Sequence, residues 1–197
     1  IHFQCQVYCI FSFIAFYVIL LLMNHFLHLP ILTGALITLR PLRESDFDAL
    51  YLIAKDSLLW EQHPQSNRYQ LSVYQKLFQE FIESKMTFVI IENTTQKIIG
   101  SSRFYDFQRE EQTIVIGYTM LSRDYWGGLF NSELKKIMCD YAFQFVNSII
   151  FHVGENNFRS RKALVKIGAK EFSESVKQLP DGKIYKVIHY RINKGEY

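Results

Sequence analysis

Hydrophobic and polar positions along the chain follow the two periods that distinguish strands from helices. Runs that alternate every second residue, or that stay apolar over a short stretch, predict strands, because successive strand side chains point to opposite faces. "ALITLRPL" shows this alternation and stops at Pro41, which cannot continue a central strand. Such runs predict strands at residues 35–42, 87–93, 97–107, 113–121, 148–153, 169–178 and 184–192.

Other segments repeat their apolar residues every three or four positions, which predicts amphipathic helices. Ser45 is a suitable N-cap before the first of them, and Gly168 is a typical stop after the last. The longest keeps its apolar spacing from Leu134 to Val146. Helices are expected at residues 46–56, 72–85 and 157–168, and after the glycine pair through residues 134–146.

The order of the predicted elements is β, α, α, β, β, β, α, β, α, β, β, in a chain of 197 residues. That length suits one domain with a substantial core. Strands that follow one another favour antiparallel pairing, whereas strands that alternate with helices favour parallel pairing. We therefore expect a single α/β domain with a mixed central sheet of about seven strands and helices on both faces.

The first segment differs from the rest, because residues 1–22 contain no charged side chain and residues 9–23 are almost continuously apolar. A membrane anchor is one interpretation, although the run is slightly short and no Lys or Arg precedes Arg40. A secretory signal would need a positively charged start and a small-residue cleavage site. We favour a third interpretation, that the segment is not part of the native protein. The expected division is an apolar leader at residues 1–30 and a domain at residues 31–197.

Composition narrows the classes of function. Lys and Arg number 22 against 19 Asp and Glu, and this small surplus does not favour a nucleic-acid partner, which needs a concentrated basic face. The three cysteines form no C-x-x-C pattern, so we expect neither a metal site nor a disulfide framework. We expect a cytoplasmic protein, with a membrane partner only if the leader is native.

Two helix starts that follow predicted strands could carry chemistry. The first is "SRDYWGGLFNSELKK", in which Gly127 and Gly128 precede a helix. A helix start offers unpaired N–H groups and a positive dipole end to an anion, and glycines let a ligand approach the backbone. The second is "GENNFRSRKALVKIGA", in which Asn157 and Ser160 begin a helix rich in Arg and Lys. Taken alone, each is explained by an ordinary turn or a capped helix with a solvated face.

Together with the order of the elements, these stretches resemble the GNAT superfamily of acetyl-CoA-dependent N-acetyltransferases over residues 31–191. The resemblance rests on "LRPLRESDFDAL", "IGYTMLSRDYWGG", "NSELKKIMCDYAF" and "NFRSRKALVKIGA", the last of which matches the family's N-x-x-S-x-x-x-x-x-K-x-G pattern. The chain is most similar to the branch that acts on ribosomal-protein N-termini and related amines. The resemblance implies the GNAT fold and acetyl-CoA as co-substrate, without a metal.

In this family the end of the fourth strand pairs with the pantetheine arm of acetyl-CoA, and the loop and helix start after it wrap the pyrophosphate. The resemblance implies that the backbone from Tyr118 to Leu121 pairs with the pantetheine arm and that the glycine loop wraps the pyrophosphate. Side chains of the second helix start would face the cofactor from the other side. The implied cofactor-binding residues are Met120, Leu121, Gly127, Gly128, Leu129, Phe130, Asn131, Asn157 and Ser160.

Several positions depart from the family pattern. The Q/R-x-x-G-x-G/A signature would begin at Asp124 and end at Leu129, where a side chain requires a slightly more open loop. Leu164 stands where many members carry a tyrosine general acid, and Val115 stands where a carboxylate base would be natural. Direct attack of a neutral amine on the thioester remains feasible, because the protein mainly needs to hold the two in line.

The connection between the first two helices contains "WEQHP", residues 60–64, and borders the acceptor site in this fold. Glu61 could attract a cationic amine and His63 could relay a proton, while Trp60 could form an apolar wall or pack inward. The amine proton could pass through water to Glu61, His63, His152 or Glu155. The candidate catalytic residues are Glu61, His63 and Tyr118, the last beside the thioester slot.

We therefore expect an N-acetyltransferase that moves an acetyl group from acetyl-CoA to a primary amine by direct attack in a ternary complex. The amine is either a peptide N-terminus or a small amine. The alternative is a non-catalytic acyl-CoA-binding regulatory module of the same fold, which the missing acid and base would explain. A third hypothesis, a membrane-anchored domain, depends on the leader.

Overall fold

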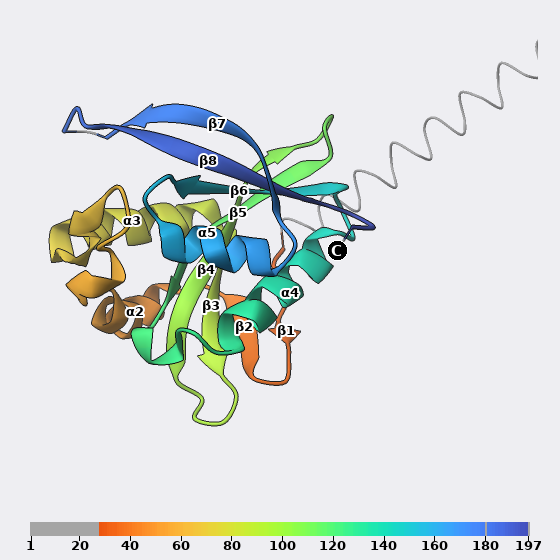
Figure 1. The fold of residues 1–197 in the computed structure, drawn as a ribbon. Helices are drawn as coiled ribbons and strands as arrows, with labels where there is room; N and C mark the ends of the chain where they lie inside the picture. The colour runs from red at the N-terminus through yellow and green to blue at the C-terminus, as the bar shows by residue number, and fades with distance from the viewer. Residues whose placement is uncertain (1–27, 180, 197) are drawn as a thin grey trace, which may run out of the picture.

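A computed structural model of the protein describes residues 28–179 and 181–196. These residues form a mixed eight-stranded sheet with helices on both faces, which confirms the predicted α/β architecture (Figure 1). None of the described helices has both the length and the apolar character that a membrane crossing requires. The apolar run at residues 9–23 lies outside the described residues, and the division of the chain at residue 30 stays a prediction.

The sheet contains the seven predicted strands and one short additional strand at its edge. Its order is β1-β2-β3-β4-β5-β6-β8-β7; β5 and β6 are parallel, and the other neighbouring pairs are antiparallel. The additional strand, β1, is too short for an alternating pattern to reveal it. The strands are β1 Leu32–Thr33, β2 Ile37–Pro41, β3 Thr87–Glu92, β4 Ile98–Gln108, β5 Thr113–Leu121, β6 Ser148–Gly154, β7 Lys170–Gln178 and β8 Ile184–Asn193.

The four predicted helices are present, with ends that differ from the prediction by up to four residues. The first begins at Phe47, because Glu44–Asp46 forms a 3-10 turn in which the Asp46 carboxylate pairs with Arg40 at 2.6 Å. The helix after the glycine pair ends at Ala142, and the turn after it still brings Val146 into the core. The α-helices are α2 Phe47–Ala54, α3 Leu71–Ser84, α4 Phe130–Ala142 and α5 Phe158–Lys166, and the 3-10 turns are η1 Glu44–Asp46, η2 Ser57–Leu59, η3 Ser66–Tyr69 and η4 Arg123–Tyr125.

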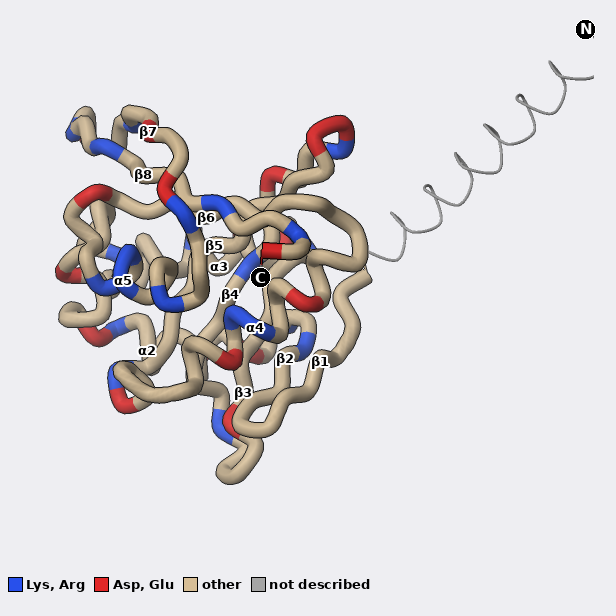
Figure 2. The backbone as a smooth tube through the Cα atoms, turned by 45° about the vertical axis from the view of Figure 1, so that its right-hand side comes forward, with Lys and Arg blue, Asp and Glu red and all other residues tan. Residues whose placement is uncertain are grey.

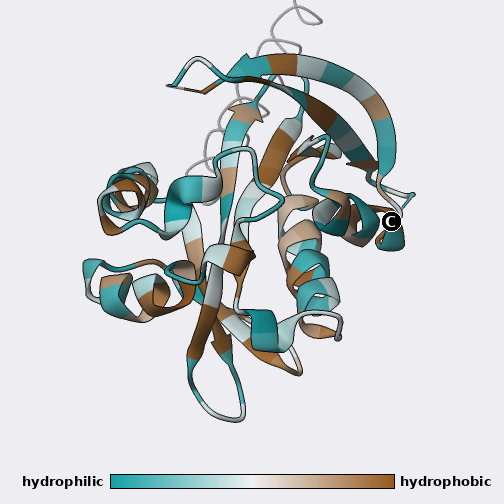
Figure 3. Cartoon of the chain, turned by 60° about the vertical axis from the view of Figure 1, so that its left-hand side comes forward, coloured by the Kyte–Doolittle hydropathy of each residue, from teal (hydrophilic) through white to brown (hydrophobic). Residues whose placement is uncertain are grey.

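Apolar side chains on both faces of the sheet hold the two helical layers. In β3, Phe88 and Ile90 join the core formed with α4 and α5, whereas Val89 between them joins the core formed with α2 and α3. Figure 3 shows the helices on either side of a sheet whose central strands carry many hydrophobic residues. Full burial of such side chains contributes roughly 1.5–3 kcal/mol each, so the central strands form a rigid base for the loops at their ends.

The strands β5 and β6 separate in the middle of the sheet. Their parallel pairing joins only residues 113–115 to 148–150, after which β6 stays paired with β8 and β5 with β4. The register of β5 against β4 shifts opposite Ser102, and Tyr118 in that interval has a φ of 49°. A bulge of this kind adds one residue to the strand and bends it. The facing edges of β5 and β6 are therefore open beyond Val115.

Candidate active site

A cavity of about 410 Å³ lies where β5 and β6 separate. Its walls come from residues 116–121 of β5, residues 151–154 of β6, the glycine loop with the start of α4, helix α5, and the connection between α2 and α3. Segments that are far apart in the sequence therefore meet in one space.

This cavity brings together most of the residues that the sequence singles out. Leu129 and Phe130 do not line it, and Glu61 lies at its rim, beside the lining residue Arg159. The predicted residues that do line it are His63, Tyr118, Met120, Leu121, Gly127, Gly128, Asn131, Asn157 and Ser160.

The glycine loop presents bare backbone to the cavity. Gly127 has a φ of 76°, a left-handed conformation in which a side chain would be strained. Gly128 has no such constraint, and the nearest atom to a Cβ placed there would be Phe130 Cδ2 at 4.0 Å. Leu129, where the family has a small residue, is 71% exposed and does not narrow the cavity. The space in front of both glycines is therefore open to a ligand.

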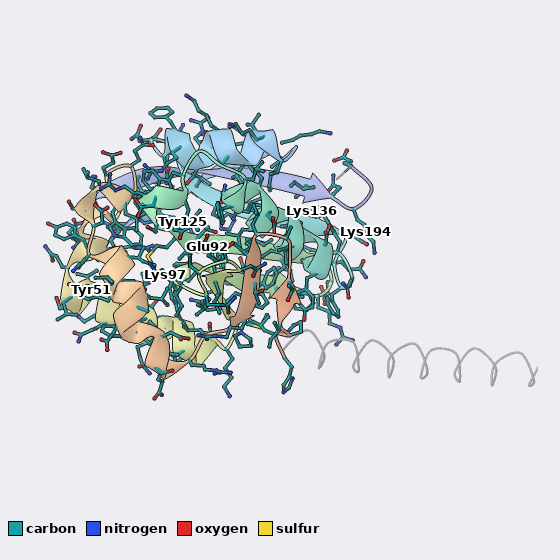
Figure 4. The ribbon with its side chains drawn as sticks, turned by 90° about the horizontal axis from the view of Figure 1, so that it is seen from below. Tyr51, Glu92, Lys97, Tyr125, Lys136 and Lys194 are labelled. Carbon is teal, nitrogen blue, oxygen red and sulfur yellow. The ribbon has the colours of Figure 1, made fainter. Side chains whose placement is uncertain are left out.

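Two aromatic residues hold the glycine loop in place. Tyr125 donates a hydrogen bond of 3.0 Å to the Glu92 carboxylate on β3, and the two side chains lie next to each other in Figure 4. The Tyr125 ring also meets Phe130 edge-on, with ring centres 4.9 Å apart, so Phe130 packs on the loop and not into the cavity. Trp126 donates its indole N–H to the Leu121 carbonyl oxygen at 2.9 Å. The loop is thus fixed by contacts within the protein.

Helix α5 is capped by Asn157 and linked to the other walls by Arg159. The Asn157 Oδ1 accepts a hydrogen bond from the Ser160 N–H at 3.2 Å, which satisfies one of the open groups at the helix start. The Arg159 guanidinium lies 3.7 Å from the centre of the Trp126 ring and donates to the Leu59 carbonyl oxygen at 3.0 Å. One side chain therefore joins the glycine loop, α5 and the connection between α2 and α3.

The connection between α2 and α3 contributes an uncharged histidine. His63 Nδ1 lies 3.0 Å from the Gln65 backbone nitrogen and 3.2 Å from the Gln65 carbonyl oxygen, so it accepts from the first or donates to the second according to the tautomer. Burial, and then the nearby Arg68 cation, lower the pKa of His63 to about 3. Trp60 is buried with its indole N–H on the Ala54 carbonyl oxygen at 2.7 Å and also lines the cavity. It therefore both packs inward and forms an apolar wall.

The other candidate proton acceptors differ in position and basicity. Burial, followed by the effect of His189, lowers the pKa of His152 to about 4, and the Tyr105 hydroxyl contacts its Nδ1 at 3.2 Å. Glu155 does not line the cavity. Glu61 is exposed, and its carboxylate lies 3.5 Å from the Arg159 guanidinium. Glu61 therefore lies beside a lining residue of the cavity without lining it itself.

Lys135 of α4 is a buried cation of the site that the sequence analysis does not single out. Its ammonium donates a hydrogen bond of 2.8 Å to the Thr119 hydroxyl and lies 5.4 Å from the centre of the Phe151 ring. The residue is 6% exposed, and burial lowers its pKa to about 8. Helical spacing could have predicted that Lys135 is buried, because it lies three and four positions before the buried Met138 and Cys139.

The charges around the cavity suit a ligand that carries phosphate. The described residues that line it include no Asp or Glu, and Figure 2 shows several basic positions along α5. The start of α4, just after the open glycine backbone, adds unpaired N–H groups and a positive dipole end. These features fit the pyrophosphate of acetyl-CoA, and the open edge of β5 fits its amide-rich arm. The basic lining residues are Arg68, Lys135, Arg159, Lys162 and Lys166.

A parallel strand pair that separates beside a bulge, followed by a glycine loop and a helix start, defines the class of this protein, the acyl-CoA-dependent acetyltransferases. The chain belongs to the GNAT acetyltransferase family: the family described as acetyltransferase (GNAT) domain matches residues 37–170. The family resemblance drawn from the sequence is thereby confirmed.

Solved structures of GNAT proteins share this fold at low sequence identity. A GNAT-family acetyltransferase from Bacillus anthracis has a TM-score of 0.66 at 19% identity, over 83% of this chain and 98% of that one. A ribosomal-protein-S5-alanine acetyltransferase from Vibrio fischeri has a TM-score of 0.64 at 20% identity, over 84% and 97%. Spermidine N-acetyltransferase from Vibrio cholerae, in complex with CoA and spermine, has a TM-score of 0.64 at 18% identity, over 83% and 99%. None of the curated proteins compared with the chain matches it.

Proposed function

We propose that the protein transfers an acetyl group from acetyl-CoA to a primary amine by direct attack in a ternary complex. The observation that carries this proposal is the one cavity that joins the bulged edge of β5 to the glycine loop and to the start of α5. Bound acetyl-CoA would supply the acetyl group as an activated thioester. The residues of the chain hold that thioester and bring the amine into line with it.

Backbone groups provide most of the cofactor binding in this proposal. The N–H groups after Trp126 surround the pyrophosphate at the positive end of α4, and Leu129 and Phe130 take part through their backbone alone. The edge of β5 that β6 leaves unpaired binds the pantetheine arm. Asn157 and Ser160 form the opposite wall. The proposed binding residues are Met120, Leu121, Gly127, Gly128, Leu129, Phe130, Asn131, Asn157 and Ser160.

The transfer forms a bond between the amine nitrogen and the acetyl carbon and breaks the bond from that carbon to sulfur. One proton leaves the nitrogen, and one proton reaches the sulfur. The Tyr118 backbone N–H, at the bulge, polarises the carbonyl oxygen of the thioester. Tyr118 thus takes its predicted catalytic part through the main chain, while its ring forms a wall of the acceptor side.

Lys135 supplies the proton to sulfur in place of the family's tyrosine, whose position is occupied by Leu164. Both residues line the cavity, and Lys135 reaches into it from the facing helix. A pKa of about 8 keeps the ammonium largely protonated at pH 7 and makes it a stronger acid than an exposed lysine. Water returns the proton to the amine of Lys135 after each turnover.

The proton of the attacking amine leaves through water to Glu61 at the rim. His63 and His152 are weak bases, because burial lowers the pKa values of both. His63 contributes instead through a hydrogen bond between its Nε2 and the acceptor, since the Gln65 backbone engages its Nδ1.

Two measurements on the purified protein test this function. Acetyl-CoA should raise the melting temperature, and CoA thiol should be released with a member of a panel of amines and N-terminal peptides. The lack of both would overturn the proposal. Stabilisation without thiol release for any amine would favour the non-catalytic acyl-CoA-binding module, the alternative that the weak basicity of the lining histidines supports.

A further inference from the structure

An arginine stands at the acceptor side of the cavity without an ion-pair partner among the described residues. Arg68 of η3 lies with its guanidinium 5.6 Å from the centre of the Trp60 ring and 5.6 Å from that of Tyr118. Its Nε donates to the Gln65 side-chain oxygen at 3.0 Å. That hydrogen bond orients the guanidinium and leaves its two terminal nitrogens for another partner.

The protein does not neutralise this cation at close range. No Asp or Glu occurs among the described lining residues, and the exposed Glu80 of α3 acts on Arg68 only at longer distance, without an ion pair. Burial lowers the pKa of Arg68, yet a guanidinium stays charged at neutral pH. The Arg68 charge also helps to lower the pKa of the neighbouring His63.

A second guanidinium strengthens the positive potential around Tyr118. Arg103 of β4 lies 5.2 Å from the centre of the Tyr118 ring and 5.8 Å from that of Phe81. Its Nε is buried and makes no hydrogen bond to any described residue. Two cations thus flank the tyrosine at which the strand bulges, although only Arg68 lines the cavity.

We infer that the acceptor is an amine that also carries a carboxylate, as a free amino acid does, and that Arg68 binds this carboxylate. This inference rests on the proposed function. The two free terminal nitrogens of Arg68 match the two oxygens of a planar carboxylate. An unpaired, partly buried cation such as Arg68 disfavours a second cation beside it and gains most from an anion. A polyamine such as spermidine, the substrate in the name of one similar enzyme, would instead place positive charge beside the Arg68 guanidinium.

The test compares matched acceptors on the purified full chain. Thiol release from acetyl-CoA is measured with an amino acid, its carboxamide, an aminoalkyl phosphonate of the same length and spermidine. Each acceptor is assayed with the wild type and with Arg68→Gln, because the ratio between the two proteins cancels differences in amine reactivity. Arg109→Gln, which changes an exposed arginine on the turn between β4 and β5, is the matched control.

The expected result is a loss of about 100-fold in kcat/KM for the amino acid in Arg68→Gln, with a change below about 3-fold for the carboxamide. Arg68→Lys keeps the charge without the paired donors and should lose about 10-fold. In the presence of CoA, the amino acid should raise the melting temperature of the wild type and of Arg109→Gln but not of Arg68→Gln.

Three outcomes would overturn the inference by itself, and a fourth would overturn it together with the proposed function. Equal variant-to-wild-type ratios of kcat/KM for the amino acid and the carboxamide would show that Arg68 does not bind the carboxylate. Thiol release in that case would still support the proposed function. Spermidine as the best acceptor would contradict the charge argument. A phosphonate preferred over the carboxylate would assign Arg68 to a phosphate-like group. If neither acetyl-CoA stabilisation nor thiol release occurs with any amine, the proposed function itself fails, and the inference fails with it.

Discussion

The ammonium of Lys135 donates a 2.8 Å hydrogen bond to the Thr119 hydroxyl in a buried place where no described carboxylate pairs with it. Burial lowers the pKa of Lys135 from 10.5 to about 8. The unfolded chain therefore binds this proton more tightly than the folded chain does. It follows that stability rises as the pH increases from about 8 to 10.5, and that the full penalty of the buried charge is present below pH 8.

Lys135→Met should make the folded protein more stable at pH 7, by about 2 kcal/mol, because methionine fills a similar volume without a buried charge. Urea unfolding at pH 7 measures this change. Lys136→Met is the control, since Lys136 is an exposed neighbour whose ammonium pairs with Asp140 at 2.8 Å. Its effect should stay below about 0.5 kcal/mol. A loss of stability in Lys135→Met would mean that the ammonium is a net stabilising group.

The same substitution should slow acetyl transfer, if Lys135 protonates the leaving sulfur. Thiol release should fall about 100-fold in Lys135→Met. In the wild type, kcat/KM should also decrease with rising pH through the Lys135 pKa of about 8, and the variant should lack this decrease. A pH profile with the same basic limb in both proteins would exclude Lys135 as the acid.

Alanine at the two adjacent glycines should separate backbone strain from cofactor binding. Gly127→Ala should lose about 1–2 kcal/mol of unfolding free energy, because Gly127 has a φ of 76°. Gly128→Ala should leave that free energy within about 1 kcal/mol of the wild type, since its Cβ enters open space. Its affinity for acetyl-CoA should nevertheless fall about 10-fold by calorimetry. Undiminished affinity in Gly128→Ala would contradict the proposed pyrophosphate site.

His63 should make the protein sensitive to mild acid. Its pKa is lowered to about 3 in the folded state, so below pH 6.5 the unfolded chain takes up the proton first. Protonation of His63 in the unfolded chain should therefore lower the free energy of unfolding by about 2 kcal/mol between pH 6.5 and 5. His63→Gln should reduce that fall in denaturant unfolding, whereas the exposed His28→Gln should not. An unchanged pH dependence in His63→Gln would mean that His63 titrates normally.

Glu61→Gln tests the proposed proton acceptor at the rim. Because the ion pair of Glu61 with Arg159 is solvent-exposed, the substitution should change stability by less than about 0.5 kcal/mol. The value of kcat/KM at pH 7 should fall about 10-fold, and the difference should shrink at higher pH, where more of the amine is already neutral. Glu110→Gln, on the exposed turn between β4 and β5, is the control. Activity equal to the wild type would remove Glu61 from the chemistry.

The fold was largely predictable because its signals are local. The continuous apolar run in residues 87–93 and the helical spacing after Leu134 reflect which side chains each element buries, and both can be read along a single stretch. The exceptions also have local causes. The strand Leu32–Thr33 is too short to show a period, and the end of α4 at Ala142 is hidden because the next turn continues to bury Val146.

The site was predictable where function depends on backbone next to a helix start. The glycine loop and the Asn157 cap carry their signal in adjacent residues, and the structure brings both to one cavity. Lys135 and Arg68 escaped notice because their environment comes from other elements: Thr119 of β5 and Phe151 of β6 for the first, Trp60 and Tyr118 for the second.

The sequence by itself determined the α/β class, the order of the elements, the family and the two helix starts suited to phosphate, because periodicity and motif spacing are properties of contiguous residues. The tertiary structure decided which charges are buried, which histidines stay neutral and which cations lack a partner. A pKa or an unpaired charge depends on the solvent and the neighbours that folding removes or supplies. Those neighbours lie far away in the chain, so only the packed sheet with its separated strands defines them.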